Sequence, residues 1–414
     1  MRGSFCAVVA AILLNAAEGG AQDRQPDTQT TFAFRTSIKA TGLLSRAPED
    51  SDLFTDRSSA DSLFRLRLEP EVRVGARAVL TVAYEQRLQL SSGAGGITTI
   101  AILPPQVAAP YRIRALDWTM SESPGTTWRQ EIDRASVQVH FPRADLTVGR
   151  QALGWGRGVI FSAVDFFAPF SPLEADREWR RGIDAVRADF KLTDRSSVDV
   201  VGAFGSTLNA SAFGARFRGY ARSLDIEMVG GRRARDLFGG ITTSAPIGQA
   251  EVHGELALFH LPAPVVPGAS DIVWKATVGG SYRFPIGSGI VAFAEYHYSG
   301  FGAERPELIL PLLSTPAYLE RYLRGDTQIL SRHAVAVTGS YEASPEFTYG
   351  GQWLHNPADG SGIVAPTLTY TLNNTVSLFG AAYLPYGAPP QGVSLKSEYG
   401  VVSLSALLQL RVYL

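Results

Sequence analysis

The mature chain is expected to lack cysteine altogether. Its single cysteine, Cys6, lies in an N-terminal segment that has Arg2, an apolar stretch over 5–14 and the small residues Gly19-Gly20-Ala21. This is the pattern of a secretory signal peptide, which we assign to residues 1–21. A mature chain without cysteine has no disulfide framework, no thiolate metal site and no cysteine nucleophile.

Long apolar runs and an excess of one charge are also missing. No later window reaches the roughly 18 consecutive apolar residues that a membrane helix needs. The net charge of -1, with 19% charged residues, gives no reason to expect a nucleic-acid partner. No linker or low-complexity tract divides the chain, so we expect a short periplasmic N-terminal segment over 22–29 and one domain over 30–414.

Apolar and charged residues alternate over stretches that are too long for a soluble β-sandwich. Over residues 64–74 every second residue is apolar or proline, and every residue between is Arg or Glu. A strand of a globular protein typically has about 5–6 residues. A strand that crosses a bilayer needs about 9–11, with lipid on one face and water on the other. The pattern predicts an all-β chain that forms a transmembrane antiparallel β-barrel.

The C-terminal residues 402–414 show the same alternation. They resemble the terminal strand by which outer-membrane barrels are recognised for assembly, although the chain ends in Leu414 where such strands usually end in Phe or Trp. We therefore expect the barrel-assembly machinery as a partner, together with outer-membrane lipid.

The lengths of the connections predict the orientation of the barrel. Tight turns occupy the even-numbered connections, and long irregular segments occupy odd-numbered ones: 45–60, 91–127, 152–180, 262–272, 299–331 and 385–398. Bacterial outer-membrane barrels show short periplasmic turns, longer outer loops and an even number of strands. We therefore expect about 18 strands (16–18) in the outer membrane of a bacterial cell.

Charged residues of these strands would face the lumen, because an Arg or Lys against lipid at the midplane would cost ~2–4 kcal/mol. Such charges either pair across neighbouring strands and stiffen the wall, or line a hydrated pathway and tune its selectivity. Their signs are too balanced to indicate an anion or cation preference. The lumen charge ladder comprises Arg65, Arg67, Arg73, Glu85, Arg87 and Arg134.

The segment 152–180 is the third outer connection, and ordered loops of this length are usually functional. Ser171, Pro172 and Glu174 have the pattern of a helix start, so a short helix is expected from Pro172 to Arg180. By its position the loop resembles the third outer loop of general porins, which folds inward and narrows the pore, and the resemblance implies the same here. The alternative is a surface loop tied by its own salt bridges. The candidate pore and constriction residues are Arg150, Gln151, Trp155, Asp165, Glu174, Asp176, Arg177, Arg180, Arg181, Asp184 and Arg187.

Two motifs flank this loop. Gly149-Arg150-Gln151 and Trp155-Gly156 begin it, and Arg181-Gly182-Ile183-Asp184-Ala185 follows it. In these motifs the chain resembles outer-membrane porin-like barrels of the alginate-export type, over about 40 residues. The resemblance implies a roughly eighteen-stranded barrel with a charged conduit, and a polysaccharide as one candidate cargo.

A second helix is expected in the segment 304–325. Thr315 and Pro316 would begin it and Gly325 would end it. This helix would act as a lid over the mouth of the barrel, or as a bump that faces lipid or a partner.

Nothing in the sequence indicates an enzyme. The six histidines are scattered, and none belongs to a nucleophile motif or a cluster of metal ligands. No catalytic residue, metal or cofactor is assigned. We expect an outer-membrane channel for diffusion or export of hydrophilic solutes, small or polymeric. The alternative is a barrel that its loops plug, which binds polysaccharide at the cell surface or assists envelope assembly without conducting.

Overall fold

The computed structural model describes residues 29–49, 52–54, 56–93, 102–103, 109–262 and 270–414. The expected signal peptide and residues 22–28 lie outside these ranges. The strands are β1 (Thr30–Arg46), β2 (Ser58–Val74), β3 (Ala78–Ser91), β4 (Asp117–Ser123), β5 (Thr126–Phe141), β6 (Ala144–Gln151), β7 (Ile183–Thr193), β8 (Ser196–Ala203), β9 (Ala212–Ala221), β10 (Leu224–Arg233), β11 (Asp236–Ile247), β12 (Ala250–His260), β13 (Ile272–Phe284), β14 (Ile290–Ser299), β15 (His333–Glu342), β16 (Phe347–Asn356), β17 (Ser361–Thr371), β18 (Val376–Tyr386) and β19 (Leu404–Tyr413). The helical segments are η2 (Leu208–Ala210), η3 (Pro306–Leu308), α3 (Ile309–Leu313) and α4 (Pro316–Arg324).

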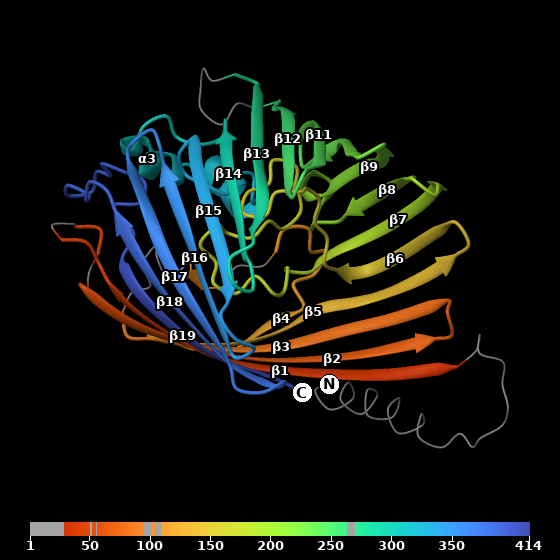
Figure 1. Ribbon diagram of the computed structural model, residues 1–414, viewed down its shortest axis with the longest axis horizontal. Helices are drawn as coiled ribbons and strands as arrows, with labels where there is room; N and C mark the ends of the chain where they lie inside the picture. The colour runs from red at the N-terminus through yellow and green to blue at the C-terminus, as the bar shows by residue number, and fades with distance from the viewer. Residues whose placement is uncertain (1–28, 50–51, 55, 94–101, 104–108, 263–269) are drawn as a thin grey trace.

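Eighteen strands close an antiparallel barrel, as the alternating pattern predicts (Figure 1). Each pairs with its neighbours in the chain, and β1 closes the ring by pairing with both β19 and β2. The nineteenth strand, β4, pairs only with β5, on residues 126–131. Beyond these residues the pairing of β5 continues with β6, from Ala135 to Phe141. The segment 91–127 is therefore not irregular throughout, because part of it extends the wall above the short strand β6.

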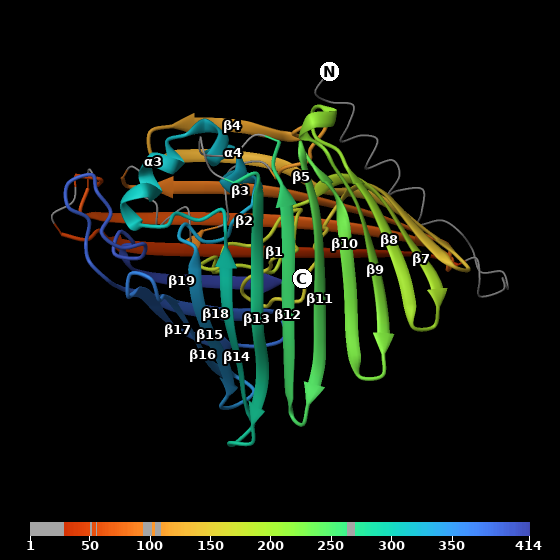
Figure 2. The same cartoon turned by 90° about the horizontal axis from the view of Figure 1, so that it is seen from above.

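Short turns lie at one end of the barrel and the long connections at the other, as expected. Every even-numbered connection is a short turn, from 75–77 after β2 to 372–375 after β17. Four of the odd-numbered connections recur below and are named here: loop 1 (47–57), loop 3 (152–182), loop 7 (300–332) and loop 9 (387–403). Two other odd-numbered connections, 234–235 and 357–360, are also short. In Figures 1 and 2 loop 1 and loop 9 lie side by side at the left.

The outer face of the wall is apolar and the inner face is polar, as burial of the outer face in a bilayer requires. Apolar side chains point outward and stay exposed: Phe64 is 46% exposed, Val278 59% and Leu408 55%. The alternate positions point inward, where Arg67, Glu85 and their neighbours are buried. This is the arrangement of a membrane barrel, with an apolar belt outside and polar groups inside.

A β-bulge interrupts this alternation in β5. The register with β3 shifts between Ala83 and Tyr84, so that Asp133 has no partner opposite it. Before the bulge Trp128 is outward, and after it Val137 is outward. The extra residue turns two consecutive charged side chains, Asp133 and Arg134, toward the interior.

Candidate functional site

Loop 3 folds into the barrel rather than over its rim (Figure 1, yellow segment in the interior). The chain turns inward at the end of β6 through Gly149 and Gly156, whose φ angles of 115° and 109° favour glycine. At Gly158 a Cβ atom would lie 1.6 Å from the Phe161 carbonyl oxygen, so no other residue fits this turn. The first half of the loop then reaches the inward faces of β12 and β14.

Glu255 of β12 is the main anchor of this half of the loop. Its carboxylate is 4% exposed. It accepts hydrogen bonds from the N–H groups of Arg157, Gly158 (2.8 Å), Ala163 (2.7 Å) and Val164 (3.3 Å) and from the hydroxyl of Ser162 (2.9 Å). The loop thus wraps around one carboxylate, and it satisfies a buried charge with backbone donors.

Glu295 of β14 anchors the residues between these donors. Its carboxylate accepts the N–H groups of Val159 (2.5 Å), Ile160 (3.0 Å) and Phe161 (2.9 Å). The Nε2 atom of His253 lies 3.2 Å from the same carboxylate, within hydrogen-bonding distance. Together the two carboxylates bind the backbone of 157–164 almost continuously.

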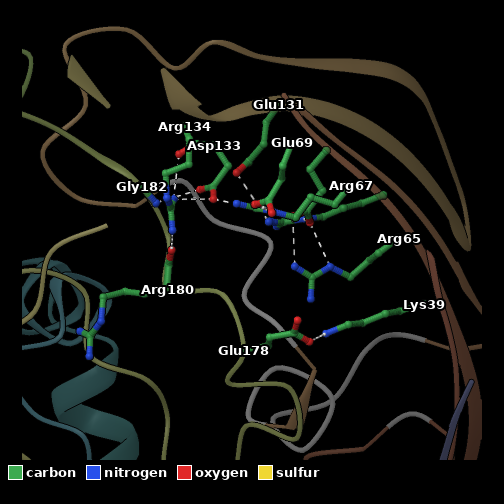
Figure 3. A network of polar contacts seen from close by, with 12 residues as sticks. Lys39, Arg65, Arg67, Glu69, Glu131, Asp133, Arg134, Glu178, Arg180 and Gly182 are labelled. Carbon is green, nitrogen blue, oxygen red and sulfur yellow. Dashed lines mark hydrogen bonds and ion pairs between the residues drawn. The ribbon is translucent and has the colours of Figure 1, made fainter. Parts of the chain in front are cut away.

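The second half of loop 3 is bound to the opposite wall by ion pairs (Figure 3). The Lys39 ammonium of β1 contacts Asp176 at 2.8 Å and Glu178 at 2.6 Å. Arg65 of β2 contacts Asp176 at 2.9 Å. The Trp179 ring lies between these cations, 3.7 Å from the Lys39 nitrogen, where a cation–π contact adds to the attraction.

The ion-pair network continues along β2, β3 and β5 (Figure 3). Arg67 contacts Glu85 at 3.1 Å and Asp133 at 2.9 Å. Asp133, on the bulge, also accepts the Gly182 N–H at 2.8 Å, and Arg134 donates to the Arg180 carbonyl. The bulge therefore binds the point where loop 3 returns to the wall at β7.

Two apolar clusters fill the space between the loops and the walls. In one, Trp155 and Phe166 of loop 3 pack against Phe238 and Phe259 of β11 and β12. In the other, Phe161 packs with residues of loop 7 and loop 9, including Ile329 and Tyr399. Loops 3, 7 and 9 therefore share packed cores inside the outer half of the barrel.

Loop 7 is held by a second set of buried ion pairs. Asp326 is fully buried and contacts Arg233 at 2.7 Å, Arg324 at 2.7 Å and Arg321 at 3.1 Å. Arg321 also contacts Asp236 of β11 at 2.6 Å. These pairs fix α4, which begins after Thr315 and ends at Gly325 as expected. The buried residue of α4 is Tyr318.

The expected helix from Pro172 to Arg180 does not form. Only a turn is present at its start, where the Glu174 N–H donates to the Ser171 carbonyl at 3.1 Å. In a helix, residues i and i+2 point in different directions. Here Lys39 binds both Asp176 and Glu178, which requires them on one side of the chain. The ion pairs to the wall outweigh the local preference for a helix.

The structure distributes the predicted constriction residues among three environments. Arg150, Gln151, Asp184 and Arg187 belong to the wall: Arg150 pairs with Asp184 at 2.7 Å, and Arg187 pairs with Asp199 at 2.9 Å. Trp155 and Asp165 are buried in the packed interior. The remaining residues lie in the second half of loop 3: Glu174, Asp176, Arg177, Arg180 and Arg181.

The predicted charge ladder is brought together in large part. Arg65, Arg67 and Arg87 all contact Glu85, at 2.9, 3.1 and 2.5 Å. Arg134 joins them through Asp133 at 2.5 Å. Arg73 stands apart, because its side chain is 60% exposed and pairs with Glu71.

Several residues of the site are not among the candidates from the sequence. Alternation places Glu255 and Glu295 on the inward face, but nothing in the sequence shows that their partners are backbone amides of loop 3. Lys39 is inward by the same alternation. The inward position of Asp133 could not be predicted, because a bulge leaves no clear mark in the sequence.

Glu174 is a carboxyl of loop 3 whose titration falls near neutrality. Burial raises its pKa to about 7, although Arg181 and the Ser171 N–H lower it. In the described part of the chain, no group of three or more His, Cys, Asp or Glu residues is placed to hold a metal ion.

Comparison with known proteins shows which solved structures share the fold. No protein-family model and no curated protein matches the chain. Among solved structures, OccAB4 of Acinetobacter baumannii has a TM-score of 0.53 at 10% identity, over 94% of this chain and 100% of that chain. OccK11 (OpdR) of Pseudomonas aeruginosa has a TM-score of 0.51 at 10% identity, over 92% and 96%. The fold is that of an outer-membrane porin. At this identity the likeness shows the fold alone, so a function for the lumen has to follow from the residues of this chain.

Proposed function

We propose that the protein is an outer-membrane channel through which small hydrophilic solutes diffuse, along a charged path narrowed by loop 3. The observation that carries the proposal is the lumen itself. A closed eighteen-stranded wall presents charged side chains inward, and loop 3 crosses the interior between Glu255 and Lys39 on opposite walls. Outer-membrane porins provide the same fold in the comparisons.

The path in this proposal runs beside loop 3 rather than through its packed clusters. Charged side chains of the wall, such as Arg187 and Asp189 of β7, extend this path toward the end of the barrel with the short turns. Placement in the outer membrane, export by the signal peptide and recognition of β19 by the barrel-assembly machinery belong to the same proposal. The resemblance to alginate-export barrels extends it to polysaccharide segments as cargo.

The test is single-channel conductance of residues 22–414 in a planar bilayer, beside a variant that lacks Val164 to Trp179. We expect stable conductance from the natural chain and a larger conductance from the deletion. A shift in gel mobility on heating shows independently that each barrel is folded. Silence from both proteins, when both are folded, would refute the channel.

A second candidate is a barrel that its loops plug, which binds ligands at the surface. The observation in its favour is that loops 3, 7 and 9 share an apolar cluster inside the barrel. A silent natural chain with a conducting deletion would decide for this candidate.

A further inference from the structure

The outer face of the barrel carries a groove at the point where the ring closes. It lies at the loop 1 end of β18, β19, β1 and β2, and it has a volume of about 610 Å³. This is within the range of small-molecule sites, about 300–1,000 Å³. Its position at the outer ends of the strands places it in the outer half of the membrane, which rests on the orientation proposed above.

The register of four strands explains the hollow. Leu44 of β1 stands opposite Ala406 of β19 and Ala60 of β2, and Ala406 stands opposite Ala382 of β18. Three alanines therefore surround one leucine on the outward face. One outward position further along β1 is Gly42, where an added Cβ would have nothing within 4 Å. The surface is low here because its side chains are small.

Larger apolar side chains rim the hollow. Leu44 is 63% exposed, Leu404 49% and Leu384 43%. All three line the groove, and most of its remaining lining is alanine or serine. A hollow between leucine side chains fits an acyl chain better than a flat apolar belt would.

A cation stands at the outer end of the groove. Arg46 follows Leu44 on the outward face, and its side chain is 67% exposed. Its ion-pair partner, Glu49, is 3.9 Å away and 73% exposed, so the pairing is weak. Arg46 is therefore available to an anionic group at the level of the headgroups.

A second cavity continues the groove beyond Arg46. It has a volume of about 360 Å³ and lies between residues 46–49, at the end of β1 and the start of loop 1, and residues of loop 9 and the adjoining ends of β18 and β19. Arg46 and Leu404 line both cavities. The lower cavity is apolar, and the upper one includes the charged side chains of Arg46 and Glu49. An apolar hollow, a cation and a second cavity that carries charged side chains follow one another along the surface, which is the arrangement of a binding site for an amphiphile.

We propose that this groove binds one phosphate-bearing glycolipid of the outer leaflet, with an acyl chain between the leucines and a phosphate at Arg46. Within a membrane the hydrophobic effect gives no preference for the groove, because other lipid is equally apolar. The selectivity comes from the fit of a chain into the hollow and from attraction between Arg46 and the phosphate.

The experiment is intact-complex mass measurement of the detergent-solubilised full chain with two probes. The first is a hexa-acylated glucosamine disaccharide lipid with two phosphates, and the second is the same lipid without phosphates. The variant Ala406→Phe fills the hollow, and Ala215→Phe on the outward face of β9 is its matched control. Arg46→Gln removes the cation, and its control is Arg57→Gln, since exposed Arg57 lines neither cavity.

We expect the natural chain and both controls to retain one phosphorylated lipid. Ala406→Phe should weaken binding of both probes at least about tenfold, as overpacking does. Arg46→Gln should weaken binding of the phosphorylated probe alone, by about threefold to fivefold, the worth of an exposed ion pair.

Equal binding by Ala406→Phe and Ala215→Phe would overturn the proposal, as would a natural chain that retains no lipid. A dimer mass that Ala406→Phe abolishes would also overturn it, because the occupant would then be a second copy of the chain. Conductance is measured in a separate experiment. A barrel that does not conduct would refute the channel, but it would not test whether the groove binds the lipid.

Discussion

Replacing Glu255 with Gln should release the first half of loop 3 from the wall. One carboxylate oxygen accepts the N–H groups of Arg157 and Gly158, and the other accepts those of Ala163 and Val164. A glutamine keeps one oxygen and places an NH₂ group against the other pair of donors. At least two hydrogen bonds to a charged acceptor are lost, and at about 1.5–3 kcal/mol each the total is about 3–6 kcal/mol.

Trypsin reports the release, because Arg157 lies inside the anchored segment. In reconstituted vesicles the rate of cleavage follows the population of the undocked loop. A loss of 3 kcal/mol raises that population by about a hundredfold. We expect the Glu255→Gln variant to be cleaved after Arg157 about a hundred times faster than the natural chain, and its single-channel current to show new, larger levels.

The matched control is Glu251→Gln, four residues earlier on the same strand, where the side chain is exposed. If Glu255→Gln and Glu251→Gln were cleaved at rates within about threefold of each other, the wrapped carboxylate would not be an anchor. The reasoning on loop 3 would then be wrong, whatever the conductance.

Three further predictions concern loop titration, loop 7 and the lipid face. Burial raises the pKa of Glu174 from 4.5 to about 7. Between these pH values the docked loop binds more protons than the undocked loop, so docking weakens as pH rises. Conductance should therefore be higher at pH 8 than at pH 5, and Glu174→Gln should flatten this dependence. Asp326→Asn leaves the buried Arg233 and the half-buried Arg321 and Arg324 without the carboxylate that they share. It should destabilise loop 7 by about 3–5 kcal/mol, seen as faster tryptic cleavage within 300–332 than in Asp359→Asn. Val278→Arg, at the centre of β13, should lower refolding stability in lipid vesicles by ~2–4 kcal/mol, whereas Val278→Leu should not; equal stability would place Val278 away from lipid.

The wall could be predicted from the sequence because its pattern repeats locally. Residues 64–74 alternate without a break, and the structure forms β2 there with the apolar side chains outward. Helix α4 was equally predictable, since Thr315, Pro316 and Gly325 mark its ends within a dozen residues. Local patterns of this kind depend on no distant contact.

The interior could not be predicted to the same extent, because it depends on contacts between distant residues. Lys39 and Asp176 are separated by 137 positions, and their pairing overrides the helix start at Ser171. The bulge at Asp133 reverses the alternation within one strand. Four of the five donors to Glu255 are backbone N–H groups, which every residue except proline carries.

That last property has a consequence for protein engineering. The main chain of segment 157–164 supplies most of the hydrogen bonds to Glu255 and Glu295, so the exposed side chain of Val159 can be exchanged without touching them. The glycines at positions 156 and 158, which the turn geometry requires, are the fixed points. Variation of Val159, which is 46% exposed, would then alter the surface that a passing molecule meets while the loop keeps its course. Position 159 is therefore a place where the inner surface of the barrel can be changed without changing how loop 3 is attached.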